Sequence, residues 1–452
     1  MKNKTFIIAI LLLVFTKVAA QNKPQQNFSF SLEQAINHAL TNNRQAINSG
    51  KDIEIAKKKR WETTAMGLPQ INGNVGYQDN FKLQTSLLPA QIFGGPAGEF
   101  AEVTFGTKHN ASASLGLTQL LFDGSYIVAL QASKTYIAFY ENYKKKTDSD
   151  VKEMITNSYG NVLLAQESTE ILKRNKSNLE KTLFDTNETF KNGLIEEENV
   201  EQLKITLATI NSNLNYVSRL KEISLKMLKI NLGIAIEDDL ILTDKLDDLT
   251  KNNMDLALTS QATNADFSAK NNINYIITEN FVQQRTLELK LQKSKALPTL
   301  AAGLNYGANS YSDSFHFINS NQRWFNYSNL GVNLSIPIFS SFARSARTQQ
   351  ANISLDKAKN DLIDVEQKLK LQYQNAKSDY EFSIEQYNSS KENLKLAERI
   401  ENKQQIKFKE GLSSSFNLTE AQRQLYTSQQ SYLQTMVDVI NKKATLEKVI
   451  SK

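Results

Sequence analysis

Two long stretches of the chain keep the spacing of apolar residues that is typical of a helix. They run from Ser125 to Asn192 and from Ala343 to Glu410, and each contains 68 residues. Glycine and proline interrupt helices more strongly than other residues do, yet the first stretch holds only Gly160 and the second holds neither. We therefore expect two continuous helices, each roughly 100 Å long at a rise of about 1.5 Å per residue.

Each long stretch ends at a glycine, followed by a polar turn and a second helical run. The two glycines, Gly193 and Gly411, lie 218 residues apart. The runs that follow carry apolar residues at steps of three, four or seven: Val200, Leu203, Leu207, Ile210, Leu214 and Val217, then Leu418, Leu425, Tyr432, Val439 and Leu446. This spacing predicts two long helical hairpins with coiled-coil packing. Taken alone, it fits an exported structural coiled-coil protein as well as a larger assembly.

Four segments outside the helical stretches show strict alternation instead. They are residues 71–78, 111–118, 302–307 and 330–336, and in each one face is mainly apolar while the other is small or polar. Each could supply the roughly 9 to 11 residues that a tilted transmembrane strand needs, with one face toward lipid and one toward a wet lumen. Alternation of this kind is also common in soluble sheets, so the number of strands carries more weight than any one of them.

Four strands cannot close around a lumen, and open strand edges are not tolerated in lipid. A membrane barrel built from this chain must therefore be shared between copies. A dimer would supply eight strands, whose interior is nearly filled by side chains, whereas a trimer would supply twelve and leave a passage. The pattern thus predicts that the chain oligomerises in order to insert.

Landmarks recur along the chain at nearly constant offsets. Leu68-Pro69 matches Leu297-Pro298 and Tyr77 matches Tyr306, both 229 residues apart, while Leu121-Phe122 matches Ile338-Phe339 at 217. The chain is therefore predicted to be a tandem duplication. We expect residues 78–110 and 308–327 to be the loops that join the paired strands. The aromatic residues near strand ends either form interfacial belts or serve plain packing: Tyr77, Phe122, Tyr306 and Phe339.

The N-terminus predicts export. Lys2 and Lys4 precede an apolar run from Phe6 to Phe15, and small residues end at Ala20, as in a cleaved signal peptide. Removing residues 1–20 leaves 50 basic and 47 acidic side chains of the 53 and 47 in the whole chain. This near balance, without a basic stripe, argues against nucleic acid as a partner.

The composition also excludes several kinds of chemistry. The chain has no cysteine, so it has no disulfide framework, thiolate nucleophile or cysteine zinc site. Its three histidines, His38, His109 and His316, are too far apart for helical metal-ligand spacing. Nucleophile elbows, phosphate loops and HExxH motifs are absent from the sequence. We expect no catalytic residue, cofactor or metal site, and a periplasmic enzyme is the least favoured reading.

Over essentially the whole mature length, the chain resembles the TolC family of outer-membrane efflux proteins. The motifs that carry the resemblance are Leu32-Glu33-Gln34-Ala35-Ile36-Asn37-His38-Ala39-Leu40 with Asn42-Asn43, the two Leu-Pro pairs, Leu120-Leu121-Phe122-Asp123-Gly124, Ile336-Pro337-Ile338-Phe339 and Asn231-Leu232-Gly233. Their order, together with the duplication and the long helical stretches, makes the resemblance specific. The chain then divides into residues 1–20 as signal peptide, 21–233 as the first repeat and 234–452 as the second.

The resemblance implies an α+β membrane protein that is a homotrimer. Its twelve strands, four per chain, would form an outer-membrane β-barrel in contact with lipid, continued by a long periplasmic α-helical barrel. It also implies a mixed equatorial region near residues 234–270 and the termini. The expected function is an outer-membrane channel of a tripartite efflux or secretion system, with a periplasmic adaptor (membrane fusion) protein and an inner-membrane pump as partners.

In this family the inner ends of the hairpins constrict the tunnel. The resemblance makes Gly193, Leu194, Gly411 and Leu412 candidate adaptor-docking tips, and it makes the polar residues after the turns candidate gate residues: Glu196, Glu197, Glu198, Asn199, Asn417 and Glu420. Where the family often has an aspartate six residues after the glycine, this chain has Asn199 and Asn417. A glutamate in a first helical turn can also simply complement the helix dipole.

Overall fold

The computed structural model describes residues 26–254, 267–319 and 321–451. The predicted signal peptide and part of the predicted equatorial segment lie outside these residues. The chain divides into two compact units, of which the first takes residues up to Asn48, Lys146–Ser268 and residues from Leu369, and the second takes Ser49–Lys145 and Ala269–Lys368. Among the described residues, no helix combines the length and the apolar character needed to cross a membrane.

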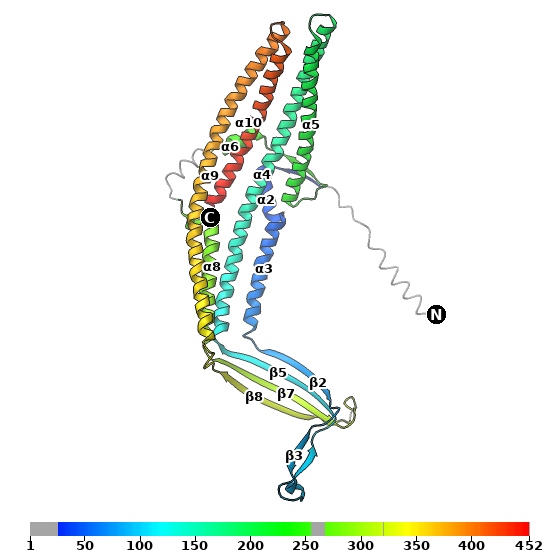
Figure 1. Ribbon diagram of the computed structural model, residues 1–452, viewed down its shortest axis with the longest axis vertical. Coiled ribbons are helices and arrows are strands. Elements are labelled where there is room, and N and C mark those ends of the chain that lie inside the picture. The colour runs from blue at the N-terminus through cyan, green and yellow to red at the C-terminus, as the bar shows by residue number, and fades with distance from the viewer. Residues whose placement is uncertain (1–25, 255–266, 320, 452) are drawn as a thin grey trace, which may run out of the picture. The chain divides into compact units, whose positions relative to one another are not determined.

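The second unit contains a four-stranded antiparallel sheet. Its strands are β2 (Gln70–Asp79), β5 (His109–Asp123), β7 (Thr299–Ser312) and β8 (Phe325–Ser335), in the order β2-β5-β7-β8 (Figure 1). Every residue of β8 is exposed, as is every residue of β2 except the half-buried Asp79. All four alternating segments of the sequence thus form strands, and the two outermost strands each have one edge without a partner in the described chain.

The register of the sheet confirms the tandem duplication at residue level. In the first hairpin Gln70 lies opposite Thr118, and in the second Thr299 lies opposite Ser335. Adding 229 to the β2 residue and 217 to its β5 partner converts the first pair into the second. These are the two offsets found in the sequence, so both repeats pair their strands in the same register.

Between β2 and β5 the structure is more ordered than predicted. A short hairpin of β3 (Thr85–Pro89) and β4 (Phe100–Thr104), with the 3-10 helix η2 (Ala90–Phe93) between its strands, lies where a loop was expected. Five-residue strands, separated by a segment that contains Gly94, Gly95, Pro96 and Gly98, are too short to reveal a period. The second predicted loop, residues 308–327, is also shorter than expected, because β7 continues to Ser312 and β8 begins at Phe325.

Helices continue from the strands. The second unit holds α8 (Ile273–Ser294), the short 3-10 helix η3 (Ala269–Asn271) and most of α3 (Arg44–Ala65). The two long helices are α4 (Gly124–Lys191) and α9 (Ala343–Lys409), and each contributes residues to both units. Their bounds agree with the two predicted glycine-poor stretches to within one residue.

The first unit contains the helical hairpins and the main core. Helix α5 (Glu197–Leu232) returns after α4, and α10 (Ser415–Ile450) returns after α9. A parallel pair of short strands, β1 (Asn27–Phe30) and β6 (Asp239–Leu242), joins residues near the N-terminus to the segment between the repeats. With α2 (Leu32–Asn42) and α6 (Leu246–Asn253), they make a mixed α/β region, as predicted for the described part of the equator. The core there is formed by Ala35, Ala39, Val151, Ile155, Tyr159, Leu228, Leu232, Leu246, Tyr380, Val437 and Ile440.

Two of the motifs behind the family resemblance meet in this core. The side chain of Asn43 donates a 2.6 Å hydrogen bond to the carbonyl of Asn231, while its own oxygen accepts from the backbone of Gln45 and so caps α3. Gly233 ends α5 with φ of 79°, and a Cβ atom there would lie 2.1 Å from the carbonyl oxygen of Asn42. Only glycine can therefore close α5 against the end of α2.

Tyr159 connects three segments of the first unit. It is fully buried on α4, and its hydroxyl lies 3.0 Å from the carbonyl oxygen of Phe30 and 3.1 Å from Oδ2 of Asp244. The same carboxylate oxygen accepts a 2.7 Å hydrogen bond from the backbone of Leu32. Burial raises the pKa of Tyr159, so the hydroxyl remains a donor at all physiological pH values.

We predict that Tyr159→Phe lowers the free energy of unfolding by about 1–2 kcal/mol, because the carbonyl of Phe30 and the carboxylate of Asp244, both in half-buried residues, lose a donor. Thermal unfolding of the detergent-purified protein, followed by circular dichroism, measures the change. Tyr216→Phe is the matched control, since Tyr216 is 62% exposed on α5. Equal melting temperatures for the Tyr159 variant and the wild type would show that this hydroxyl contributes nothing to the region.

Candidate functional site at the hairpin tips

The two hairpin turns have the same backbone geometry. Gly193 and Gly411 adopt φ of 73° and 72°, and each donates its N–H to a carbonyl three residues earlier. The following leucines close the turns through Leu194 N–H to Thr189 O and Leu412 N–H to Lys407 O, as in a glycine-terminated helix end. Leu194 is 74% exposed and Leu412 is 78% exposed. Each tip therefore presents one uncovered leucine on a rigid turn.

A cavity of about 990 Å³ separates the two tips within the first unit. The candidate residues that line it are Leu194, Glu196 and Asn199 from the first hairpin and Gly411, Leu412 and Asn417 from the second. The other four candidates, Gly193, Glu197, Glu198 and Glu420, are not part of its lining. The structure thus brings together six of the ten candidate residues around one space.

Ser415 links the hairpins across this cavity, and the sequence reading did not single it out. Its backbone N–H lies 3.3 Å from Oδ1 of Asn199, and its hydroxyl donates a 2.7 Å hydrogen bond to Oε1 of Gln202. Ser415 is almost fully buried. The only sequence signal nearby is Ser414, which caps α10 by accepting from the N–H of Asn417, and that signal marks a helix start rather than a contact.

The acidic candidates differ in their surroundings. Glu196, Glu197 and Glu198 are exposed at the start of α5, where carboxylates favourably oppose the helix dipole. Glu198 accepts a 3.0 Å hydrogen bond from Gln202. Glu420 accepts a 2.8 Å hydrogen bond from Nε of Arg423, and this contact lowers the pKa of the Glu420 carboxyl group. Arg423 therefore offsets part of the charge that Glu420 brings to this end of the hairpin.

Further along, the hairpins are joined by polar contacts between helices. Asn175 on α4 donates a 2.8 Å hydrogen bond to Gln429 on α10, and Lys448 on α10 pairs with Asp150 and Glu153 on α4 at 2.7 Å. Glu401 on α9 is half-buried against α10, and burial raises the pKa of its carboxyl group. Such contacts fix how α10 lies against its neighbours along the hairpins.

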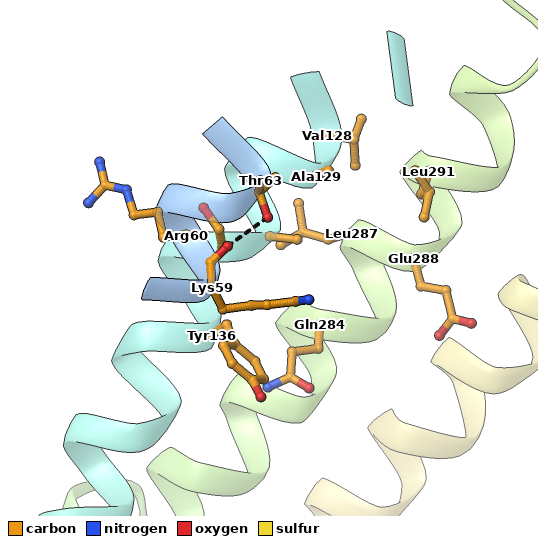
Figure 2. A pocket seen from close by; sticks show the side chains of 12 residues that line it. Lys59, Arg60, Thr63, Val128, Ala129, Tyr136, Gln284, Leu287, Glu288 and Leu291 are labelled. Atoms are coloured by element: carbon orange, nitrogen blue, oxygen red, sulfur yellow. Dashed lines mark hydrogen bonds between the residues drawn. The ribbon is translucent and has the colours of Figure 1, made fainter. Parts of the chain in front are cut away.

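The second unit contains a separate cavity of about 470 Å³ between α3, α4 and α8 (Figure 2). Val128 and Ala129 of α4 and Leu287 and Leu291 of α8 give it an apolar floor. Figure 2 shows Lys59 extending across it beside Tyr136, whereas Arg60 points away from it. It has the size of a small-ligand site, but the residues around it include no nucleophile paired with a base.

Potential metal ligands are not clustered in the described parts of the chain. Of the three histidines, His109 lies 2.9 Å from the hydroxyl of Tyr77 and 3.3 Å from Oδ1 of Asp79. This contact lies at the loop end of β2 and β5 and holds the two strands together. His38 is on α2 and His316 is in the loop after β7, each in its own surroundings.

The fold of the chain is similar to that of several solved structures. Three similar solved structures are CusC (TM-score 0.72, 15% identity, 95% of this chain and 96% of that chain), the CmeC outer membrane channel of Campylobacter jejuni (0.69, 16%, 93% and 85%) and the MtrE outer membrane channel of Neisseria gonorrhoeae (0.69, 15%, 93% and 88%). The chain has the fold of outer-membrane channels.

A protein-family model also matches part of the sequence. The model of the family described as outer membrane efflux protein matches residues 281–451. The predicted resemblance to TolC-like channels is confirmed by this match and by the similar structures. No curated protein matches the chain. The family is described as efflux proteins, and the similar structures are described as channels.

Proposed function

We propose that the chain is one subunit of a homotrimeric channel in the outer membrane, with its helical hairpins in the periplasm. The channel passively conducts substrates outward from a periplasmic adaptor (membrane fusion) protein and an inner-membrane pump. The observation that carries this proposal is the four-stranded sheet, whose exposed outer strands β2 and β8 each have one edge that no strand of the described residues pairs with. Three copies would complete both edges and give a twelve-stranded barrel with a passage through it.

The alternative is an exported structural coiled-coil protein. The helices fit both functions, but the sheet favours the channel. On β8, the exposed side chains of Leu330, Val332 and Leu334 face the same way, and in water an exposed apolar strand with a free edge is prone to aggregate. In a lipid-embedded barrel the same residues form the apolar outer surface.

The test of the channel proposal is the detergent-corrected mass of the protein extracted from membranes. We expect three times the mass of the mature chain, and stable conductance steps when this species is added to a planar bilayer. A monomeric protein that is released without detergent would refute the channel and favour the coiled-coil function.

The exposed leucines suit the tips for binding a partner. Leu194 and Leu412 lie on equivalent turns, so a trimer would present six such leucines, and we place the adaptor-docking site there together with Gly193 and Gly411. In a trimer these leucines would gather apolar surface at one end of the assembly, and apolar patches on a protein surface mark interaction sites.

We predict that combining Leu194→Asp with Leu412→Asp reduces cross-linking to the adaptor at least about tenfold, as expected when two interface anchors are lost. Ile223→Asp is the control, because Ile223 is 60% exposed on α5 but lies away from the turn. Undiminished cross-linking by a trimeric double variant would exclude the tips as the docking site.

We also place the periplasmic gate at this end, formed by Glu196, Glu197, Glu198, Asn199, Asn417 and Glu420. In a trimer, symmetry would repeat each group around one entrance, where a ring of carboxylates favours cations. The hydrogen bonds of Ser415 to Asn199 and Gln202 hold the two hairpins together within a subunit. Separating them would widen the entrance.

We predict that Glu420→Gln lowers the cation preference in single-channel recordings, whereas Arg423→Gln raises it by removing the compensating charge. Because Arg423 lowers the pKa of Glu420, the carboxylate stays ionised as the pH falls through 4.5, the ordinary value. The preference should therefore persist at that pH and decline only below it. If both variants keep the cation preference of the wild type, Glu420 is not part of the gate.

A further inference from the structure

In the sheet, one pair of neighbouring strands joins the first repeat to the second. We call this pairing the seam within the chain. Strand β5 closes the first repeat and β7 opens the second, and they pair antiparallel with Leu117 opposite Leu304. If copies of the chain meet edge to edge, β8 closes the second repeat of one copy and β2 opens the first repeat of the next. The seam between copies is then the repeat-equivalent of the seam within the chain.

From this equivalence we infer the residue register of the seam between copies: β8 of one subunit pairs antiparallel with β2 of the next, with Leu334 opposite Val75. The inference rests on the proposed trimer. It follows from the two repeat offsets: adding 217 to the number of Leu117 gives Leu334, and subtracting 229 from the number of Leu304 gives Val75. Because these offsets already reproduce the register of both hairpins, they are a tested measure of which residues correspond.

The side chains at the inferred seam match as they do at the internal one. Within the chain, Leu115 lies opposite Tyr306, and the equivalent pair is Val332 opposite Tyr77. An aliphatic side chain meets a tyrosine in both cases. The neighbouring pair, Leu334 with Val75, joins two aliphatic residues as Leu117 and Leu304 do.

Glycines give a second, independent indication of the register. Gly116 lies opposite Asn305 within the chain, and a Cβ atom on Gly116 would lie 2.9 Å from Oδ1 of that asparagine. The equivalent residues are Asn333 on β8 and Gly76 on β2. A glycine therefore again lies opposite an asparagine, but here the glycine belongs to the strand that opens a repeat and the asparagine to the strand that closes one. Sliding β8 by two residues would place Asn333 opposite Asn74 or Gln78, and the small-to-large match would be lost.

The alternation of faces excludes odd shifts. In the inferred register, the apolar face of β8, with Val332 and Leu334, continues into the apolar face of β2, with Val75 and Tyr77. A shift of one residue would place these apolar side chains beside the polar face that carries Asn74 and Gln78. The regular pairing extends to Ile336, beyond which the chain turns at Pro337, whose carbonyl accepts a 2.8 Å hydrogen bond from Arg344.

Engineered disulfides test the register, and the absence of native cysteine in the chain leaves no background. Two matched pairs cover both faces of the strands: Leu334→Cys with Val75→Cys, and Ser335→Cys with Asn74→Cys. Within one chain β2 and β8 are three strand spacings apart, roughly 14 Å along the sheet, which is too far for a disulfide. Oxidation can therefore link only neighbouring copies.

We expect both pairs to give covalent dimers and trimers on non-reducing gels after mild oxidation of membranes. The shifted controls keep one cysteine and move the other by two residues: Val75→Cys with Val332→Cys, Val75→Cys with Ile336→Cys, and Asn74→Cys with Asn333→Cys. They should cross-link roughly tenfold more slowly, because diagonal neighbours lie about 7–8 Å apart, beyond disulfide range.

Faster cross-linking by a shifted pair would overturn the register. If no pair cross-links while the reduced variants keep the mass of a trimer, the seam is formed by other residues, and the inference fails although the channel proposal stands. A monomeric mass for the wild-type chain would instead remove the trimer and the inference together. Single-cysteine variants, measured in the same way, show whether each substitution alone permits assembly.

Discussion

Every backbone N–H and C=O group needs a hydrogen-bond partner, and the rest of the structure depends on this constraint. Inside hydrocarbon no water can replace a missing strand, so β2 and β8 cannot remain edges there. A chain that contributes a four-stranded sheet must then obtain the closure of that sheet from other copies. The internal duplication offers a simple way to do so, because a contact already made once within the chain can be made again between chains with equivalent residues.

The helical part obeys a different requirement, which is the burial of apolar surface. Its largest core lies where α2, β1 and β6 meet the long hairpins, and buried side chains such as Ile155, Leu228 and Ile440 fill it. Some polar residues within that core are satisfied locally, as at Asn43, Tyr159 and Asp244. The tips, in contrast, end in exposed leucines and a wide cavity. A firmly packed middle thus carries hairpin ends that are held together by few bonds, as the proposed gate requires.

Much of the fold could be predicted because it follows from local rules. The scarcity of glycine and proline predicted the bounds of α4 and α9 to within one residue, and period-two alternation predicted β2, β5, β7 and β8. The pair β1 and β6 escaped prediction because four-residue strands show no period and their partners are 212 residues apart. At the site, the turn glycines could be recognised from the sequence, and the contact of Glu420 with Arg423 has ordinary helical spacing. The link from Ser415 to Asn199 could not be predicted, since it depends on how two hairpins 216 residues apart pack.

Among the described residues, a hairpin such as β3–β4 occurs only in the first repeat. Elsewhere in the sheet the repeats are equivalent, so a trimer would present six nearly identical strand pairs, a pseudo-sixfold arrangement. At the loop ends of the strands, however, three hairpins would alternate with three plain loops, and the rim would be strictly threefold. A molecule that recognises this rim, such as an antibody, would meet three copies of its epitope, because the insertion lies in only one half of the duplicated chain.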